Sequence, residues 1–219
     1  MPRPPVRWIS LFLLLITAVP VLTGETFVIS DRTLRLAEDK YGLSARKRLL
    51  AWQDLMRAQY SDDLTKLEKV NRFFNKIPFL DDITHWKVED YWATPIEFLA
   101  SDGGDCEDFA IAKYFTLIGL GVAENQLTLT YVKALSLDQT HLVLTYYPAP
   151  GMEPLVLDNL VETIEPSSKR TDLLPVYSFN ASGLWVAKQR GRGEKLGHGS
   201  RLRPWRDLLT RMTEEFHQK

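Results

Sequence analysis

The sequence predicts a single α+β domain, with helices in its first half and an antiparallel sheet in its second half. Apolar residues recur every three or four positions between residues 34 and 75, which is the spacing of amphipathic helices. From residue 127 onward, short stretches rich in Val, Leu, Thr and Tyr alternate with turn-forming residues. Because helices followed by strands are typical of α+β proteins, we expect the helices to pack on the sheet.

Local signals mark the ends of the first helices. Ser44 can cap a helix that runs to residue 60, and a second helix follows Asp62 and stops before Pro78. Residues 78–92 combine a proline, paired aspartates and aromatic residues without periodicity, so we expect an ordered loop there. Residues 94–97, Thr-Pro-Ile-Glu, have the form of a capping box and predict another short helix.

The most apolar helix is predicted to begin at Cys106. Residues 109–118 are apolar on nearly every side, interrupted only by Lys113 and Thr116, which indicates a buried helix. Gly119 or Gly121 can end it.

The second half of the chain is predicted to form strands and a final helix. Short connections between the first strands favour an antiparallel meander. The predicted strands are residues 127–134, 140–147, 154–158, 176–180 and 184–187. Residues 189–219 are predicted as a flexible loop, rich in Gly, Arg and Lys as far as residue 200, followed by a C-terminal helix that opens at Pro204.

The composition excludes several classes of protein. The 219 residues are 45% hydrophobic and 25% charged, which is ordinary for a globular domain and excludes a disordered or collagen-like chain. The single cysteine can form no internal disulfide. The formal net charge is -1, so no strong positive field exists to attract phosphates, and we expect no nucleic acid partner.

The N-terminus has the order of a secretory signal. Arg3 and Arg7 precede the apolar residues 8–19, and the small residues Thr23 and Gly24 follow. We therefore assign residues 1–24 to a signal peptide and residues 25–219 to the folded domain, which has a formal charge of -3 because the two arginines are lost from a total of -1. An uncleaved membrane anchor is the less favoured alternative, because the apolar run is short for a bilayer span.

Cys106 is the first candidate for chemistry. At the start of a helix, unpaired N–H groups and the positive end of the helix dipole favour the thiolate, which is the nucleophilic form of cysteine. An inert core cysteine would fit better inside the apolar run that follows. We therefore expect Cys106 to be a nucleophile.

A cysteine nucleophile needs a base and a group that orients it. His141 lies near the start of one predicted strand, and Asp158 lies at the end of the next. Neighbouring antiparallel strands would bring the two side chains together if the register allows. Asp138 is a rival for the orienting role, because it lies close to His141 in the sequence.

At these residues the chain resembles the bacterial transglutaminase-like cysteine proteinases, and within them the LapG-type periplasmic adhesin proteases. The resemblance rests on residues 92–95, 103–114, 140–144 and 156–159, and the run Gly-Gly-Asp-Cys-Glu-Asp at residues 103–108 is its most specific part. It implies a papain- or transglutaminase-like fold and a catalytic triad of Cys106, His141 and Asp158.

The resemblance also implies a biological role. Proteases of this type are periplasmic and require calcium, and they cut the N-terminal region of a large cell-surface adhesin after a di-alanine site, which disperses the biofilm. The periplasmic domain of an inner-membrane cyclic di-GMP receptor, of the LapD type, sequesters them. The adhesin, the receptor and calcium are therefore the expected partners and cofactor of this chain.

Three carboxylates beside the nucleophile bear on the calcium expectation. Asp105, Glu107 and Asp108 should raise the pKa of the Cys106 thiol by like-charge repulsion, which a bound divalent cation would offset. The alternative is that Asp105 caps the helix and the other two complement its dipole without any metal. By the resemblance, Asp105 and Glu107 match the calcium residues most directly.

Two other functions use the same residues. A transglutaminase-type acyl transferase would keep the same triad and resolve the thioester with an amine in place of water. A non-catalytic transglutaminase-like binding module would use the fold alone, and the intact set of Cys106, His141 and Asp158 argues against that alternative.

Overall fold

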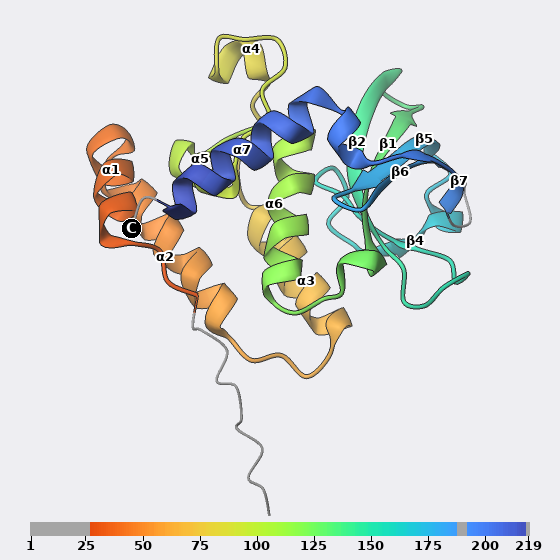
Figure 1. Cartoon of the computed structure of the whole chain (residues 1–219), viewed down its shortest axis with the longest axis horizontal. Helices are drawn as coiled ribbons and strands as arrows, with labels where there is room; N and C mark the ends of the chain where they lie inside the picture. Colours follow the sequence, from red (N-terminus) through yellow and green to blue (C-terminus); the bar gives the residue numbers. More distant parts are fainter. Residues whose placement is uncertain (1–26, 188–191, 218–219) are drawn as a thin grey trace, which may run out of the picture.

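The computed structural model describes residues 27–187 and 192–217, which form a layer of helices packed against an antiparallel sheet (Figure 1). The predicted signal peptide, residues 1–24, lies outside the described residues. Within the described ranges, no helix has both the length and the apolar character needed to cross a bilayer. The α+β prediction is therefore confirmed.

Side-chain caps set the starts of several helices. Ser30, Asp62 and Thr94 each accept a hydrogen bond from a backbone N–H in the first turn, and the predicted capping box between Thr94 and Glu97 is present. The helices are α1 (Asp31–Tyr41), α2 (Leu43–Arg57), α3 (Asp63–Phe74), α4 (Asp82–His85), α5 (Pro95–Ser101), α6 (Cys106–Gly119) and α7 (Arg203–His217), with short 3-10 turns η1 (Glu124–Gln126), η2 (Ser167–Lys169) and η3 (Gly199–Arg201).

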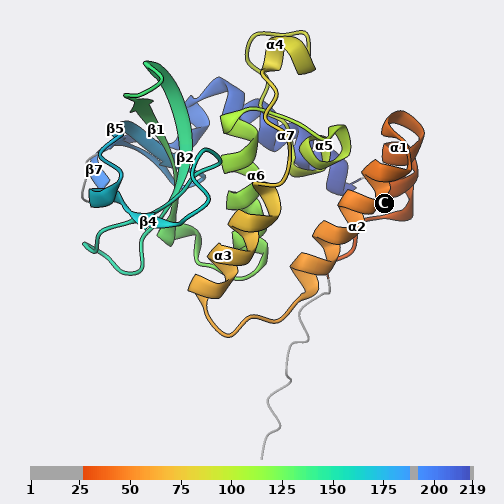
Figure 2. The ribbon, with the colours of Figure 1, turned by 180° about the vertical axis from the view of Figure 1, so that it is seen from behind.

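Helix α6 is the centre of the molecule. It lies between the other helices and the sheet in both views (Figures 1 and 2), and contacts α3 and α5 on one side and β1 and β2 on the other. Its side chains from Phe109 to Leu117 are buried except for that of Phe115, as the apolar pattern predicts.

Seven strands form one sheet in the order β4-β3-β2-β1-β5-β6-β7, with all neighbours antiparallel. Strands β1 to β4 follow one another as the predicted meander, and the chain then crosses to pair β5 with the free edge of β1. The strands are β1 (Leu127–Ala134), β2 (Gln139–Tyr146), β3 (Leu155–Leu157), β4 (Glu165–Pro166), β5 (Leu173–Asn180), β6 (Gly183–Ala187) and β7 (Arg192–Gly197).

Two predicted irregular segments contain regular structure. The expected loop at residues 78–92 includes the single turn of α4, capped by Asp81. The predicted flexible loop at residues 189–200 is wrong in its middle, because residues 192–197 form strand β7 against β6. This strand pairs with β6, the strand that precedes it in the chain, and a composition rich in Gly, Arg and Lys, which lacks β-branched and aromatic residues, did not indicate it. Residues 188–191 lie outside the described residues.

The predicted C-terminal helix exists as α7 and packs back onto the domain. It crosses from the sheet toward α5 along one side of the molecule (Figure 1). Trp205 is fully buried and stacks on Phe115 of α6 with 5.5 Å between ring centroids. Helix α7 therefore belongs to the core of the domain.

Candidate active site

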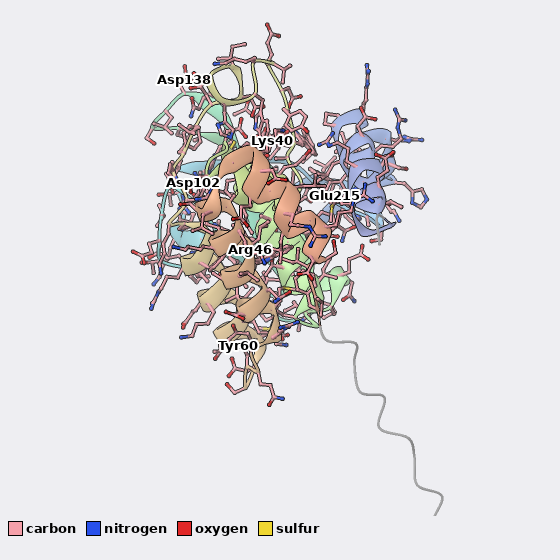
Figure 3. All side chains as sticks on the ribbon, turned by 90° about the vertical axis from the view of Figure 1, so that its left-hand side faces the viewer. Lys40, Arg46, Tyr60, Asp102, Asp138 and Glu215 are labelled. Atoms are coloured by element: carbon pink, nitrogen blue, oxygen red, sulfur yellow. The ribbon has the colours of Figure 1, made fainter. Side chains whose placement is uncertain are left out.

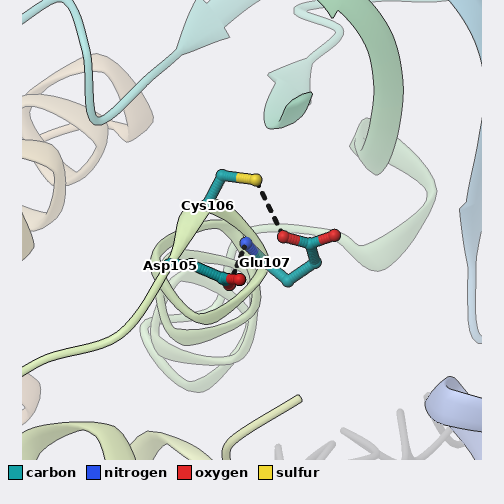
Figure 4. A group of neighbouring side chains, drawn as sticks. All are labelled: Asp105, Cys106 and Glu107. Carbon is teal, nitrogen blue, oxygen red and sulfur yellow. Dashed lines mark hydrogen bonds between the residues drawn. The ribbon is translucent and has the colours of Figure 1, made fainter. Parts of the chain in front are cut away.

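The start of α6 places a thiol among carboxylates (Figure 4). Cys106 is the first residue of the helix, and Asp105 and Asp108 form a reciprocal capping box around its first turn. A Cβ atom added to Gly104 would lie 2.2 Å from Asp108 Oδ2, so glycine is needed for this close approach. The local sequence thus brings three acidic side chains to the end of the helix that carries the cysteine.

The Cys106 thiol has two polar neighbours. It donates a hydrogen bond of 2.8 Å to Glu107 Oε2, while Glu107 Oε1 accepts one of 3.1 Å from the Tyr131 hydroxyl. The backbone N–H of Leu142 also hydrogen-bonds to the sulfur. This last contact seats the thiol against β2, at the residue that follows His141.

Burial is the main cause that raises the pKa of the Cys106 thiol, and the Glu107 and Asp105 carboxylates raise it further. The Leu142 N–H lowers this pKa, but by less. The net change in the thiol pKa is upward, so burial and the two carboxylates outweigh the lowering expected of the helix end. The expected effect of the neighbouring carboxylates is present.

His141 and Asp158 are in direct contact. Leu144 of β2 pairs with Leu157 of β3, so Asp158, the next residue, lies opposite Val143 and has His141 as its diagonal neighbour on the same face of the sheet. His141 Nε2 and Asp158 Oδ1 are 2.8 Å apart, and both side chains are buried. Strand register, which the sequence left open, thus brings the predicted pair together.

Asp138 does not take the orienting role. Its side chain is 84% exposed and pairs with Lys133 at 2.6 Å, and Figure 3 shows it at the edge of the molecule. The sequence left this choice open because Asp138 is only three residues from His141. Of the two aspartates, it is Asp158 that contacts His141 in the described part of the chain.

The Asp158 carboxylate is held in its ionised form. Burial raises its pKa, but hydrogen bonds from His141, the Leu160 backbone N–H and Arg170 together lower the pKa by more than burial raises it. The resulting pKa is about 2. Arg170 Nη2 lies 2.7 Å from Asp158 Oδ2. Sequence reasoning did not find Arg170, because an arginine in an irregular segment carries no periodic or motif signal.

A fourth acidic residue, Asp82, joins the site from α4. Carboxylate oxygens of Asp82, Asp105 and Asp108 lie within 4.8 Å of one another, and a second group joins Asp105 and Cys106 to Glu107 within the same limit. Asp82 Oδ1 is buried and has no hydrogen-bond partner within the described ranges. Asp108, in contrast, accepts backbone N–H groups of Ala93 and Asp105 with its two oxygens.

Burial and mutual repulsion act on this cluster. Burial first, and then the carboxylates around it, raise the pKa of Asp105 to about 9 and that of Asp82 to about 6. Closely spaced buried carboxylates with an unsatisfied oxygen are the donor set that a calcium ion prefers. The only signal for Asp82 in the sequence was the Asp81-Asp82 pair in a segment predicted as a loop.

A hollow opens over the ends of β1, β2 and β5. It has a volume of about 500 Å³, with Tyr131, Lys133, Thr140 and Tyr177 among its lining residues. The Tyr131 hydroxyl also donates a hydrogen bond to Glu107, the residue after Cys106.

A cysteine at the start of a buried helix, seated against a strand whose histidine contacts an aspartate, defines a transglutaminase-like cysteine protease fold. The family model of the bacterial transglutaminase-like cysteine proteinases matches residues 49–191, and the chain belongs to this family. The search of curated proteins finds no match.

Solved structures agree with this assignment. The chain is 44% identical to LapG of Legionella pneumophila, solved after EGTA treatment, with a TM-score of 0.74 over 85% of this chain and 99% of that one. The calcium-bound LapG of the same organism is 46% identical, with a TM-score of 0.71 over 83% of this chain and 97% of that one.

Proposed function

We propose that this protein is a calcium-dependent periplasmic cysteine endopeptidase that cuts the N-terminal region of a large surface adhesin after a di-alanine site and so promotes biofilm dispersal. The observation that carries the enzymatic part is the placement of Cys106 against β2, beside the buried contact of His141 with Asp158. The likeness to LapG supports the substrate class and the biological role.

The geometry assigns a role to each member of the proposed triad. The ionised Asp158 carboxylate can only accept a hydrogen bond, so His141 Nε2 carries the ring N–H that donates to it. The other ring nitrogen, Nδ1, is then free to take the proton of the Cys106 thiol. The Cys106 thiolate attacks the scissile carbonyl, and His141 returns the proton to the leaving amine. Water then hydrolyses the thioester. Backbone N–H groups at the start of α6 can stabilise the oxyanion.

The acidic residues at the start of α6 fit a calcium ion. Asp105 and Glu107 would hold it, together with Asp82, whose Oδ1 lacks a partner in the described part of the chain. Asp108 is a further candidate, although its two oxygens already accept backbone N–H groups. When bound, the cation supplies the positive charge that offsets the carboxylates around Cys106. The calcium-bound structure of Legionella LapG supports this assignment.

The cellular setting of the proposal follows from the resemblance. A periplasmic location agrees with the signal-like residues 1–24. The proposed regulator is the periplasmic domain of an inner-membrane cyclic di-GMP receptor of the LapD type, which would sequester the protease. Mixing the purified protein with such a domain and measuring cleavage tests this: we expect inhibition at near-stoichiometric ratios, and unchanged cleavage would remove the regulator from the proposal.

Incubation with an adhesin N-terminal fragment tests the central proposal. The wild type with calcium is expected to give two products whose masses sum to the fragment plus one water. The Cys106→Ala and Asp158→Asn variants should give none or very little, whereas the matched control Asp54→Asn should cleave normally, because Asp54 is exposed on α2, which packs against α1 and α5. Cross-linked products would favour acyl transfer, and cleavage by Cys106→Ala would end the proposal.

Chelation tests the calcium assignment separately. Excess EGTA should abolish cleavage by the wild type, and added calcium should restore it. Cleavage that continues in EGTA would remove calcium from the mechanism and leave the triad intact.

A further inference from the structure

Both oxygens of the Asp158 carboxylate accept hydrogen bonds. Oδ1 accepts hydrogen bonds from His141 Nε2 at 2.8 Å and from the Leu160 backbone N–H at 3.0 Å, while Oδ2 pairs with Arg170 Nη2 at 2.7 Å. The Asn75 side chain donates to the Asp158 backbone carbonyl at 2.8 Å and fixes the main chain. Because the Asp158 side chain is fully buried, protein groups alone decide its orientation.

We propose that Arg170 is a positioning residue of this protease. It binds Oδ2 of Asp158, and thereby directs Oδ1 toward His141 and keeps the carboxylate charged. This inference rests on the proposed function, because it concerns the efficiency of the same triad. Arg170 would then be a fourth residue of the site, next to the catalytic triad that the family resemblance implies. Sequence reasoning did not find it.

The surroundings of Arg170 argue against a purely stabilising role. Its side chain is 5% exposed, and Nη1 is buried with no hydrogen-bond partner in the described part of the chain. A buried ion pair contributes little to stability on balance, because desolvation of both charges offsets their attraction. Because burying the Arg170 charge costs desolvation free energy, we infer that the main effect of this arginine is on the orientation and charge of Asp158.

Arg170 is itself held from outside. Its Nε and Nη2 donate to the two Asp172 oxygens at 3.0 Å and 2.8 Å, and the Asp172 side chain reaches solvent. Nη2 is shared between the two aspartates, so the guanidinium is fixed in one plane with its edge toward Asp158. The result is a continuous line of contacts from solvent to His141.

Within the residues that the structure describes, the charged or titratable groups found against Asp158 are His141 from β2, Lys113 from α6, and Arg170 and Asp172 from the segment before β5. Burial lowers the pKa of Lys113 to about 7, so this lysine loses its charge near neutral pH. His141 is neutral while it acts as the base, and Asp172 is negative. Arg170 is therefore the permanent positive charge beside Asp158.

Kinetics of Arg170→Met and Arg170→Lys test the proposal on the calcium-loaded protein. For Arg170→Met we expect kcat on an adhesin fragment to fall roughly 10- to 100-fold with KM within about twofold, because misdirection of a catalytic group affects the transition state more than binding. The acid limb of kcat should move to higher pH by about one unit, since Asp158 then protonates more easily. Arg170→Lys retains the charge and should recover most of both.

A matched control separates this effect from the loss of any arginine pair. Arg46 pairs with Glu38 at 3.4 Å, and Figure 3 shows it on the α1 and α2 side of the molecule, away from the sheet. Arg46→Met should leave kcat and the acid limb unchanged. A folded Arg170→Met protein with wild-type kcat and acid limb would overturn the proposal.

A measurement without proteolysis keeps the two proposals distinct. The Asp158 carboxyl carbon, assigned by comparison with Asp158→Asn, can be titrated by 13C NMR, and its midpoint should rise in Arg170→Met and stay near wild type in Arg46→Met. A wild type that cleaves no fragment would end the proposed function, and the NMR midpoint would still decide the role of Arg170. If Arg170→Met does not fold, Arg170→Gln, which also removes the charge, takes its place: a lowered kcat with unchanged KM supports positioning, and wild-type kinetics overturn it.

Discussion

At the scale of single residues, the surroundings of Cys106 disfavour the thiolate that the proposed reaction needs. The helix end favours a Cys106 thiolate, but burial and the Glu107 and Asp105 carboxylates outweigh it and raise the thiol pKa. The same carboxylates, with Asp82, repel one another, and burial makes that repulsion stronger. A bound cation would reduce the repulsion among these carboxylates, and it would also favour the Cys106 thiolate.

When calcium is chelated, Asp105 should destabilise the protein at neutral pH, because its carboxyl must take up a proton as the chain folds. The pKa of Asp105 in the fold is about 9, above its ordinary value near 4, so the cost appears as pH rises from about 4 to 9 and is largely present at pH 7. Asparagine still caps a helix. We expect Asp105→Asn to be more stable than the wild type in EGTA at pH 7 by roughly 1–3 kcal/mol.

The same variant should reverse its rank when calcium is present. Ligand binding to the native state raises the midpoint of thermal unfolding, and loss of a ligand carboxylate should remove most of that increase. Thermal scans in EGTA and in excess calcium measure both effects. An Asp105→Asn protein that keeps the full calcium-dependent increase would show that Asp105 is not a ligand.

At the scale of elements, α6 combines two tasks. Its apolar surface is the core of the molecule, and its first turn carries the chemistry. Lys113 is the exception to this division, because its side chain is buried in the middle of the helix with its amine 5.9 Å from the Phe109 ring centroid. The sequence showed Lys113 as an interruption of the apolar run, and the structure shows that it does not escape to solvent.

Lys113 should lower stability most at and below neutral pH. Its pKa falls from 10.5 to about 7 on folding, so the unfolded chain binds more protons between these values and stability rises with pH across them. We expect Lys113→Met to stabilise the protein by up to roughly 4 kcal/mol at pH 7, with the gain disappearing near pH 10.5. Denaturant unfolding at both pH values measures this difference.

Lys66 offers a matched control for this substitution. It pairs with Asp63 at 2.8 Å near the surface of α3, so Lys66→Met should cost about 0–1 kcal/mol at either pH. A Lys113→Met protein that behaves in the same way would mean that the buried amine finds compensation in the fold.

At the scale of the whole molecule, α7 ties the helical layer to the sheet. Trp205 packs between Phe115 of α6 and Phe179 of β5, and Arg211 donates a hydrogen bond to the Trp92 carbonyl. Further along α7, Glu215 accepts a hydrogen bond from the Thr94 hydroxyl at 2.8 Å. The last helix therefore braces the segment that leads into the candidate active site.

Truncation of Trp205 should weaken the whole domain. We expect Trp205→Ala to cost about 3–5 kcal/mol, as for other large buried aromatics, and to lower the unfolding midpoint for helices and sheet together. Trp205→Phe should cost much less, because it retains the stack on Phe115 and the indole Nε1 has no hydrogen-bond partner within the described ranges. Separate unfolding of helical and sheet signals would contradict a single core.

Much of this protein could be predicted from local signals. Capping residues and apolar periodicity are short-range properties, so the starts of α3, α5 and α6 and five of the seven strands of the described sheet were predictable. The predicted cap at Ser44 is wrong, because Ser44 lies inside α2, whose N-cap is Gly42. The candidate nucleophile followed from its position at a helix start. The pairing of His141 with Asp158 was predictable only as a possibility, because strand register cannot be seen in one sequence.

The tertiary structure alone decided which side chains surround these residues. Asp82 and Arg170 are brought in by contacts between separate segments of the chain, and the energies of such contacts leave no local pattern. Burial likewise set the direction of the Cys106 thiol pKa, because desolvation depends on everything packed around the sulfur. The sequence by itself determined where the chemistry lies, and the fold decided its charge balance.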